Sequence, residues 1–349
     1  MADISTPLPP IVLDGKLVET IWGGSSLADI AGKAIERGAT IGESWETATD
    51  TVAQNAPWMG MTLGEITARH GETLLGSRAV AVFGERFPLL AKFLDAREQL
   101  SVQVHPDDQQ AQARSPGKLG KTEAWYILRA EPGAEIVYGV RRPVSAGEVR
   151  EAIAATHLED LLLTAKVQVG DVIFVPAGTI HAIGAGIVLY ELQEYSDITY
   201  RLYDYGRVQA DGKPRELHVE AGIAVSRLVP PAMTKAVPVT LVETQTHTER
   251  VLAACRYFVE EELILRGALA VEPRPSSCEI LSVIEGACEV TGNAGGAMLR
   301  TGQTAVLAAS LGERTLSSTQ ARLIRSWVPE EADAALAAWR AAQPAPVLF

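Results

Sequence analysis

The chain has 349 residues, of which 47% are hydrophobic and 21% charged, which suits a globular protein with a packed core and room for two domains. Its net charge of −12 and pI near 5.1 argue against binding to nucleic acid or to an anionic membrane, because both rely on Lys and Arg. Three cysteines without a Cys-x-x-Cys pair, no membrane-length apolar run and no signal-peptide pattern at the N-terminus predict a cytoplasmic protein.

Short apolar segments that end at Gly, Pro, Asn or Asp dominate the chain, which is the pattern of a mainly β protein. Helices are predicted at 62–75 and at 145–165, where Thr62 with Glu65 and Ser145 with Glu148 have the spacing of a capping box. Strands are predicted at 88–96, 100–106, 122–130, 134–140, 171–178, 187–195, 279–286, 288–292, 304–310 and 321–328. Because helices do not alternate with these strands, the pattern favours a sandwich or barrel.

A row of polar side chains lies in one predicted strand, LSVQVHPDD. Successive side chains of a strand point to opposite faces, so one face is apolar and the other carries Ser101, Gln103 and His105. The next strand begins in GKTEAWYIL, and Lys121 and Glu123 also share one face. Each strand therefore presents several polar groups on a single face.

The most specific pattern is GDVIFVPAGTIHAIG, in which Pro176-x-Gly178 follows an apolar strand and precedes His181. Proline fixes φ and glycine opens the backbone, so a tight turn is predicted that delivers His181 to the start of the next strand. This pattern resembles the second motif of the cupin superfamily, small β-barrels that hold a metal ion inside. The first cupin motif normally has two histidines one residue apart, and the corresponding pair here is Gln103 and His105.

By this resemblance, the metal ligands would be Gln103, His105, Glu123 and His181. Two imidazoles, a carboxylate and an amide oxygen suit Zn²⁺, with Fe²⁺, Mn²⁺ and Co²⁺ as alternatives. Such a set leaves room for water or a substrate oxygen, which predicts a catalytic rather than a structural ion.

A proline-rich segment at 229–240 is typical of a boundary between domains. Beyond it, GQTAVLAAS resembles a degraded copy of GDVIFVPAG, which predicts two related β domains. The first copy continues to His181, whereas the equivalent position of the second copy is assigned to Glu313. We therefore predict a metal-binding catalytic cupin domain with helical insertions at 1–235, and a smaller, degenerate cupin-like β-barrel without a metal site at 236–349.

Four stretches in chain order, LSVQVHPDD, GKTEAWYIL, PAGTIHAIG and YSDITYRLYDYGR, together resemble the type I mannose-6-phosphate isomerases, especially their short bacterial form. IWGG at 21–24 and IGESWE at 41–46 fit the same family. The resemblance implies a cupin fold, an aldose–ketose isomerase and one zinc ion on the four residues named above. Many longer members have a histidine at the position of Gly120, so no role of that histidine is carried over.

The resemblance also implies which residues meet the substrate. Arg201 and Lys121 would be catalytic, and Ser101, Lys121 and Asp197 would bind substrate. From the residues alone, Glu123 could instead form a salt bridge with Lys121, and Arg201 could pair with an aspartate.

The reaction implied is the interconversion of mannose 6-phosphate and fructose 6-phosphate through a cis-enediol. It needs a base for a carbon-bound proton and cations that stabilise the enediolate oxygens. The alternative is a non-catalytic sugar-phosphate-binding or sensing cupin, and a third possibility is an Fe²⁺ oxygenase. Acidic charge disfavours a nucleic-acid-binding regulator, and Lys121 with Arg201 suits a phosphosugar better than O₂ chemistry. The expected partner is a small sugar phosphate, without nucleic acid or membrane, bound by a monomer or homodimer.

Overall fold

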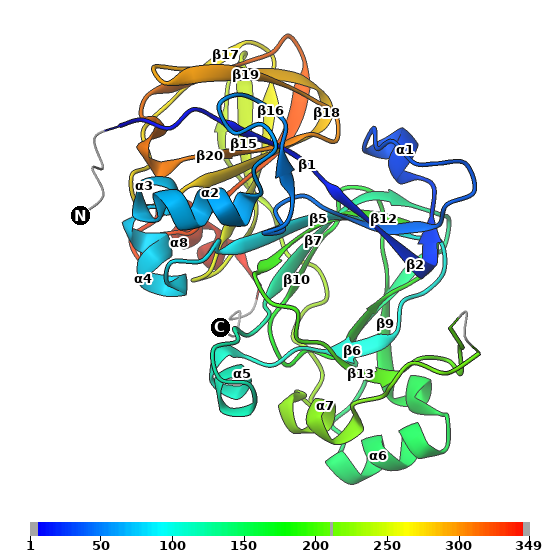
Figure 1. Ribbon diagram of the computed structural model, residues 1–349. Coiled ribbons are helices and arrows are strands. Elements are labelled where there is room, and N and C mark those ends of the chain that lie inside the picture. Colours follow the sequence, from blue (N-terminus) through cyan, green and yellow to red (C-terminus); the bar gives the residue numbers. More distant parts are fainter. Residues whose placement is uncertain (1–5, 210–211, 345–349) are drawn as a thin grey trace.

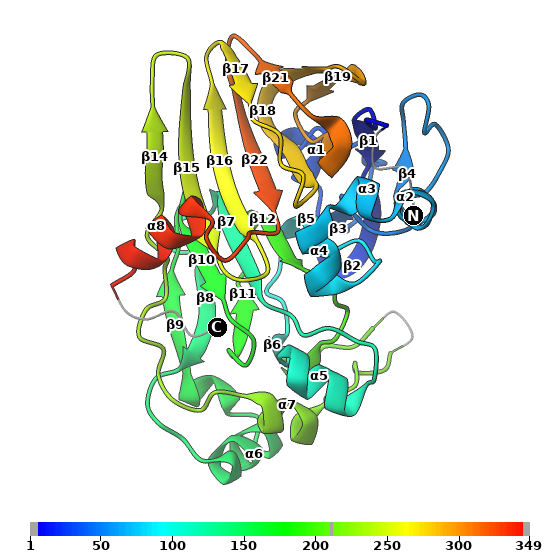
Figure 2. The same cartoon turned by 90° about the vertical axis from the view of Figure 1, so that its left-hand side faces the viewer.

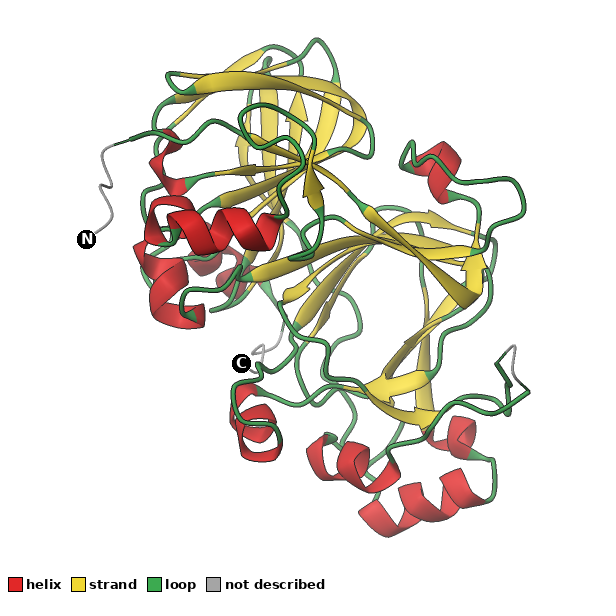
Figure 3. Ribbon diagram, viewed as in Figure 1, coloured by secondary structure: helices red, strands yellow, loops and turns green. Residues whose placement is uncertain are grey.

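The protein consists of two β units that pack against each other, with helices on their outer surfaces (Figures 1 and 3). The structure is a computed structural model and describes residues 6–209 and 212–344. Residues 1–5, which the expectation about a signal peptide includes, lie outside the described residues. Within the described ranges, none of the helices is long and apolar enough to cross a membrane.

Two facing sheets form the N-terminal barrel, which lies at the lower right of Figure 1. Among the described residues, its first sheet has the order β10 (Val172–Val175), β7 (Glu123–Ala130), β12 (Ile187–Glu194), β5 (Leu89–Ala96), β2 (Lys16–Gly24) and β3 (Ile41–Trp45). Its second sheet has the order β13 (Tyr200–Tyr203), β6 (Val102–Val104), β11 (His181–Ile183), β8 (Glu135–Val140) and β9 (Leu162–Lys166). Trp125, Ile173 and Ile183 pack between the sheets. This mainly β, two-sheet barrel confirms the predicted cupin fold.

The C-terminal β unit contains the third sheet, whose strands stand side by side in the upper half of Figure 2. Among the described residues, the order is β14 (Val239–Glu243), β15 (His247–Ala254), β16 (Val259–Leu265), β22 (Ala321–Trp327), β18 (Glu279–Gly292), β20 (Thr304–Leu307), β1 (Ile11–Asp14) and β4 (Val52–Ala53). The far end of β18 pairs with β19 (Gly295–Arg300) and β21 (Arg314–Ser317), and β21 pairs with β17 (Ala268–Val271). The two strands predicted at 279–286 and 288–292 are therefore one, because a register shift after Val283 interrupts β18 without ending it.

Segments from the start of the chain belong to the C-terminal β unit. Strand β1 pairs with β20, and three helices pack nearby: α2 (Leu63–His70), α3 (Glu72–Leu75) and α4 (Ser77–Phe83). The N–H of Cys278 donates to the carbonyl of Leu75, and the N–H of Arg78 donates to the carbonyl of Ser276, both at 2.8 Å. The predicted domain boundary between residues 235 and 236 stays a prediction. Residues well before this boundary, those of β1 and of α2 to α4, pack with the C-terminal β unit.

The remaining helices cover the outside of both units. They are α1 (Leu27–Ile30), α5 (Asp108–Arg114), α6 (Ala146–Ala154), η1 (Leu158–Leu161), α7 (Val219–Val225), η2 (Ala309–Leu311) and α8 (Ala334–Ala342). Both predicted capping boxes are present, at Thr62 and at Ser145. The helix predicted at 145–165 is too long: α6 ends at Ala154, and 162–166 form strand β9. Pairing with β8 satisfies the backbone of that segment and overrides its helical pattern.

The two similar stretches occupy matching places in the two units. Gly170 and Gly302 both have a positive φ, of 86° and 81°, which favours glycine at the turn before each strand. The last residue of β10 pairs with Glu123, and the last residue of β20 pairs with Glu279. Glu279 of the C-terminal unit therefore matches Glu123 of the N-terminal barrel.

Candidate metal centre

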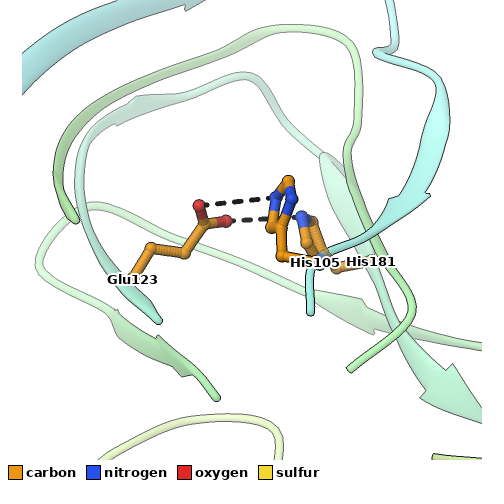
Figure 4. A group of neighbouring side chains, drawn as sticks. All are labelled: His105, Glu123 and His181. Carbon is orange, nitrogen blue, oxygen red and sulfur yellow. Dashed lines mark ion pairs between the residues drawn. The ribbon is translucent and has the colours of Figure 1, made fainter. Parts of the chain in front are cut away.

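Three side chains from three strand ends point toward one another inside the N-terminal barrel (Figure 4). His105 follows β6, Glu123 begins β7 and His181 begins β11, and each is at most 1% exposed. One ligand atom of each side chain lies within 4.8 Å of the other two. These three predicted ligands therefore converge.

Local sequence explains why the histidines face inward. Val102 and Val104 are fully buried against helices on the outer side of their sheet, so the alternate side chains of that strand face the interior. The Pro176-x-Gly178 turn has the predicted form: Gly178 has a φ of 85°, and its N–H donates to the carbonyl of His105 at 2.8 Å. The turn thus ties the start of the His181 strand to the end of the His105 strand.

The tautomers of the two histidines fit a bound cation. Nδ1 of His105 lies 2.8 Å from the carbonyl of Ile198, and Nδ1 of His181 lies 2.9 Å from the carbonyl of Thr179. Each Nδ1 therefore carries the proton, and each Nε2 presents a lone pair to Glu123, at 3.7 Å and 3.3 Å respectively. Nitrogen and oxygen lone pairs that face each other without a hydrogen repel unless a positive ion lies between them, so these residues fit a metal ion.

Burial sets the charge of this group. It lowers the pKa of His181 to about 4 and that of His105 well below its usual value, so both imidazoles are neutral at neutral pH. Burial also raises the pKa of the Glu123 carboxyl, and the positive charge of Lys121 opposes that effect. Neutral imidazole is the form that binds metals.

Gln103, the fourth predicted ligand, lies next to the three. Its Nε2 is 3.2 Å from Nε2 of His181, to which it can donate a hydrogen bond. Rotating the amide by 180° would present its oxygen at the same place. The structure thus puts Gln103 within reach of the centre.

Lys121, Ser101 and Arg201 lie beside the centre. Nζ of Lys121 is 2.8 Å from the Oε2 atom of Glu123, so the salt bridge that the sequence left open is present. Nε of Arg201 donates to Oγ of Ser101 at 3.3 Å, and the guanidinium also donates to the carbonyl of Glu216 at 2.9 Å. Burial, together with nearby Arg215, lowers the pKa of Arg201.

Asp197 lies at the rim rather than with the buried group. Its side chain is 71% exposed and pairs at 2.9 Å with Lys118, whose side chain is 51% exposed. Within residues 6–209 and 212–344, Arg201 forms no ion pair with an aspartate, the alternative that the sequence left open: Asp204 pairs with Arg207 and Arg215 instead.

Sequence reasoning missed a second buried charged group in the same barrel. Nζ of Lys92 lies 3.4 Å from Glu43 and 3.3 Å from Glu191, and the indole of Trp125 donates to Glu191 at 3.1 Å. Burial alone would lower the pKa of Lys92, but the two carboxylates raise it above its usual value. The sequence feature that could have indicated this buried group is the single lysine in the apolar stretch PLLAKFLDA.

A cavity of about 940 Å³ opens onto this region. Its lining includes the hydroxyl of Ser101 and the amide of Gln103. Six cationic side chains outnumber three carboxylates in it: Arg86, Lys92, Lys118, Lys121, Arg201 and Arg215 against Glu43, Glu191 and Asp197. In a protein of net charge −12, such a concentration of cations favours an anionic ligand.

The matching place in the C-terminal unit holds arginines instead of metal ligands. Glu313, the residue assigned to the place of His181, is exposed, and the next residue, Arg314, is the buried first residue of β21. Arg314 pairs with Glu279, which Arg274 also approaches at 3.3 Å. These two arginines therefore satisfy the Glu279 carboxylate. Among the described residues, His105, Glu123 and His181 form the only group of three possible metal ligands.

The fold and this centre define a cupin whose barrel can hold a metal ion beside a cationic cavity. A model for the catalytic domain of type I phosphomannose isomerase matches residues 11–130. The mannose-6-phosphate isomerase ManA of Bacillus subtilis is 40% identical over 281 residues, which cover 79% of this chain and 86% of that protein. The mannose-6-phosphate isomerase of Streptococcus mutans is 37% identical over 286 residues, which cover 81% and 87%.

A solved structure agrees with these sequences. The crystal structure of mannose 6-phosphate isomerase from Bacillus subtilis superposes with a TM-score of 0.81 at 34% identity, covering 91% of this chain and 99% of that one. The chain therefore belongs to the type I phosphomannose isomerase family, as the sequence resemblance predicted.

Proposed function

We propose that this protein is a metal-dependent isomerase that interconverts mannose 6-phosphate and fructose 6-phosphate. The observation that carries the proposal is the His105–Glu123–His181 group beside Lys121, inside a chain that is 40% identical to a mannose-6-phosphate isomerase. The cationic cavity supports a phosphorylated substrate, because phosphate is bound by charge-assisted hydrogen bonds from Lys, Arg and hydroxyl groups.

We propose Zn²⁺ as the ion, held by Gln103, His105, Glu123 and His181. Two histidines and a carboxylate are a usual ligand set of catalytic zinc, and the Nδ1 hydrogen bonds that turn both Nε2 atoms toward Glu123 support it. When bound, a divalent ion supplies Lewis-acid polarisation of the sugar's oxygens.

The remaining residues of the site would bind and orient the sugar. Lys121 and Arg201 would stabilise negative charge on the enediolate oxygens as a proton moves between C1 and C2 of the substrate. Ser101 holds the Arg201 guanidinium in place and would contact the substrate. Asp197, on the rim, would meet the part of the sugar nearest the cavity opening.

Several wider expectations belong to the same proposal. The protein would act in the cytoplasm as a monomer or homodimer on a small sugar phosphate, without nucleic acid or membrane. The part at 1–235 would carry catalysis, and the part at 236–349 would be a degenerate copy without a metal ion.

A coupled assay with mannose 6-phosphate tests the proposal. Purified protein should turn the sugar over, lose activity after chelation and regain it when Zn²⁺ is added back. Binding of mannose 6-phosphate without turnover, in metal-loaded protein, would favour the non-catalytic sugar-phosphate-binding cupin instead.

A further inference from the structure

The backbone that carries Lys121 is fixed at three consecutive N–H groups. Oδ1 of Asp108 accepts from the N–H of Gly120 at 2.9 Å, and the carbonyl of Pro106 accepts from the N–H of Lys121 at 3.0 Å. Oε1 of Glu194, which is 1% exposed, accepts from the following N–H at 2.8 Å. The direction of the Lys121 side chain therefore depends on groups outside its own strand.

Close packing makes the Asp108 contact specific. A Cβ atom on Gly120 would lie 2.5 Å from the backbone nitrogen of Asp108, so only glycine allows this approach. Asp108 is also the first residue of α5, whose cap, Asp107, fixes the start of the helix with its own hydrogen bond to Gln110.

The other carboxylate oxygen of Asp108 is held by the C-terminal β unit. The hydroxyl of Tyr257 donates to Oδ2 at 2.7 Å, and the guanidinium of Arg256 lies 3.3 Å away. Both residues lie in the turn between β15 and β16, with the guanidinium 4.6 Å above the Tyr257 ring. Tyr257 is 7% exposed, so its hydroxyl is held in one place, whereas Asp108 is partly exposed.

These contacts form one path from the C-terminal unit to the candidate centre. They run from Tyr257 through Asp108 and Gly120 to Lys121, whose Nζ lies 2.8 Å from Glu123. The described lining of the cavity includes no residue after Arg215, so the strands from β14 onward can affect the cavity only indirectly, through contacts such as these.

We propose that Tyr257 is a positioning residue for the isomerase: its hydroxyl fixes Asp108, which in turn holds the backbone that directs Lys121 toward Glu123. This inference rests on the proposed function. A hydrogen bond to a carboxylate is stronger than one between neutral groups, and small displacements of catalytic groups reduce rates steeply. The C-terminal unit thus contributes to turnover without supplying a side chain to the cavity.

The test compares Tyr257→Phe with Tyr126→Phe, a matched control. Tyr126 also donates its hydroxyl to a carboxylate across the same interface, to Glu262 at 2.8 Å, without touching the Lys121 segment. We expect Tyr257→Phe to lower kcat by about fivefold with less than about a twofold change in KM, and Tyr126→Phe to change neither. Zinc content should equal that of wild type in both variants.

Two further measurements separate positioning from general damage. Hydrogen exchange at the Gly120 amide should be faster in Tyr257→Phe than in Tyr126→Phe, whatever the activity. In a Lys121→Ala background, Tyr257→Phe should lower kcat no further, because residues that act through one group are not additive. If Tyr257→Phe folds poorly, Asp108→Asn, which keeps an acceptor for Gly120, should retain more activity than Asp108→Ala.

The outcomes distinguish this inference from the proposed function. Wild type without turnover refutes both. If wild type turns the sugar over, two results would refute this inference alone. One is a Tyr257→Phe variant that equals Tyr126→Phe in kcat and in hydrogen exchange at Gly120. The other is an effect of Tyr257→Phe on kcat that persists in full in the Lys121→Ala background.

Discussion

At the scale of single residues, the candidate metal centre is marked by buried acceptor atoms that have no hydrogen-bond donor. Nε2 of His105 and Oε1 of Glu123 are buried without a hydrogen-bond partner among the described residues, while Oε2 of Glu123 is paired only with Lys121 and the distant Nε2 of His105. Leaving buried acceptors unpaired costs free energy that a bound ion would recover. The arrangement is therefore explained by a ligand rather than by folding stability.

Removing one histidine should separate the ion from the fold. We expect His181→Ala to abolish metal binding and turnover while the far-UV circular dichroism stays native, because a catalytic ion is not needed to close a core of this size. Glu313→Ala is the control and should change neither, since Glu313 is exposed in the C-terminal unit. Loss of metal in Glu313→Ala would contradict a single site.

Arg201 should act mainly in the transition state. We expect Arg201→Ala to lower kcat by roughly 10²–10³-fold and to raise KM less, because the charge that it stabilises appears as the enediolate forms. Arg201→Lys keeps the charge but loses the planar fork that contacts Ser101 and Glu216, so it should restore activity only in part. Steady-state kinetics with metal content checked would decide; a normal kcat with a raised KM would mean that Arg201 only anchors phosphate.

At the scale of elements, strand β16 carries three consecutive buried glutamates, and their surroundings differ. Glu261 lies 2.7 Å from Arg325, and Glu262 is bound by Tyr126 and Arg322. Glu260 is fully buried, and neither of its oxygens has a hydrogen-bond partner among the described residues. Burial alone raises its pKa to about 8.

This raised pKa predicts a pH dependence of stability. Between about pH 4.5 and 8 the folded state keeps the Glu260 proton, whereas the unfolded chain releases it, so stability falls as pH rises through this window. The slope would be at most about 1.4 kcal/mol per pH unit. Glu260→Gln, which is neutral at every pH, should remove this decline. Urea unfolding at pH 5.5 and 8.5 measures it, and equal pH slopes for variant and wild type would contradict the prediction.

At the scale of the whole molecule, the two β units use matching positions for different purposes. Glu123 faces two histidines, whereas its match, Glu279, faces Arg314 and Arg274. In the C-terminal unit, the guanidinium groups donate to the carboxylate of Glu279 and neutralise its charge. The N-terminal barrel leaves the corresponding space for an ion.

This contrast predicts the metal content of the protein. Purified, unchelated protein should contain about one divalent ion per chain, because the described residues bring together one group of possible metal ligands, in the N-terminal barrel. Elemental analysis measures the number of ions per chain, and His181→Ala, which should bind no ion, is the negative control. A ratio near two, or activity that survives complete removal of the ion, would contradict a single catalytic centre.

The sequence by itself predicted the strands that carry motifs and three side chains that converge in the structure, those of His105, Glu123 and His181. Alternation in LSVQVHPDD placed the side chains of one strand on two faces, and Pro176-x-Gly178 determined the turn before His181. These features are local, since strand alternation and turn geometry depend on neighbouring residues.

Only the tertiary structure decided which distant residues meet. It turned the end of a predicted helix into β9, buried Arg314 against Glu279 while leaving Glu313 exposed, and brought Lys92 to Glu191 and Tyr257 to Asp108. Each of these contacts joins parts of the chain that lie far apart in sequence or depends on the pairing register of a strand. A shift of one residue in register moves every side chain to the other face, and local sequence does not determine that register.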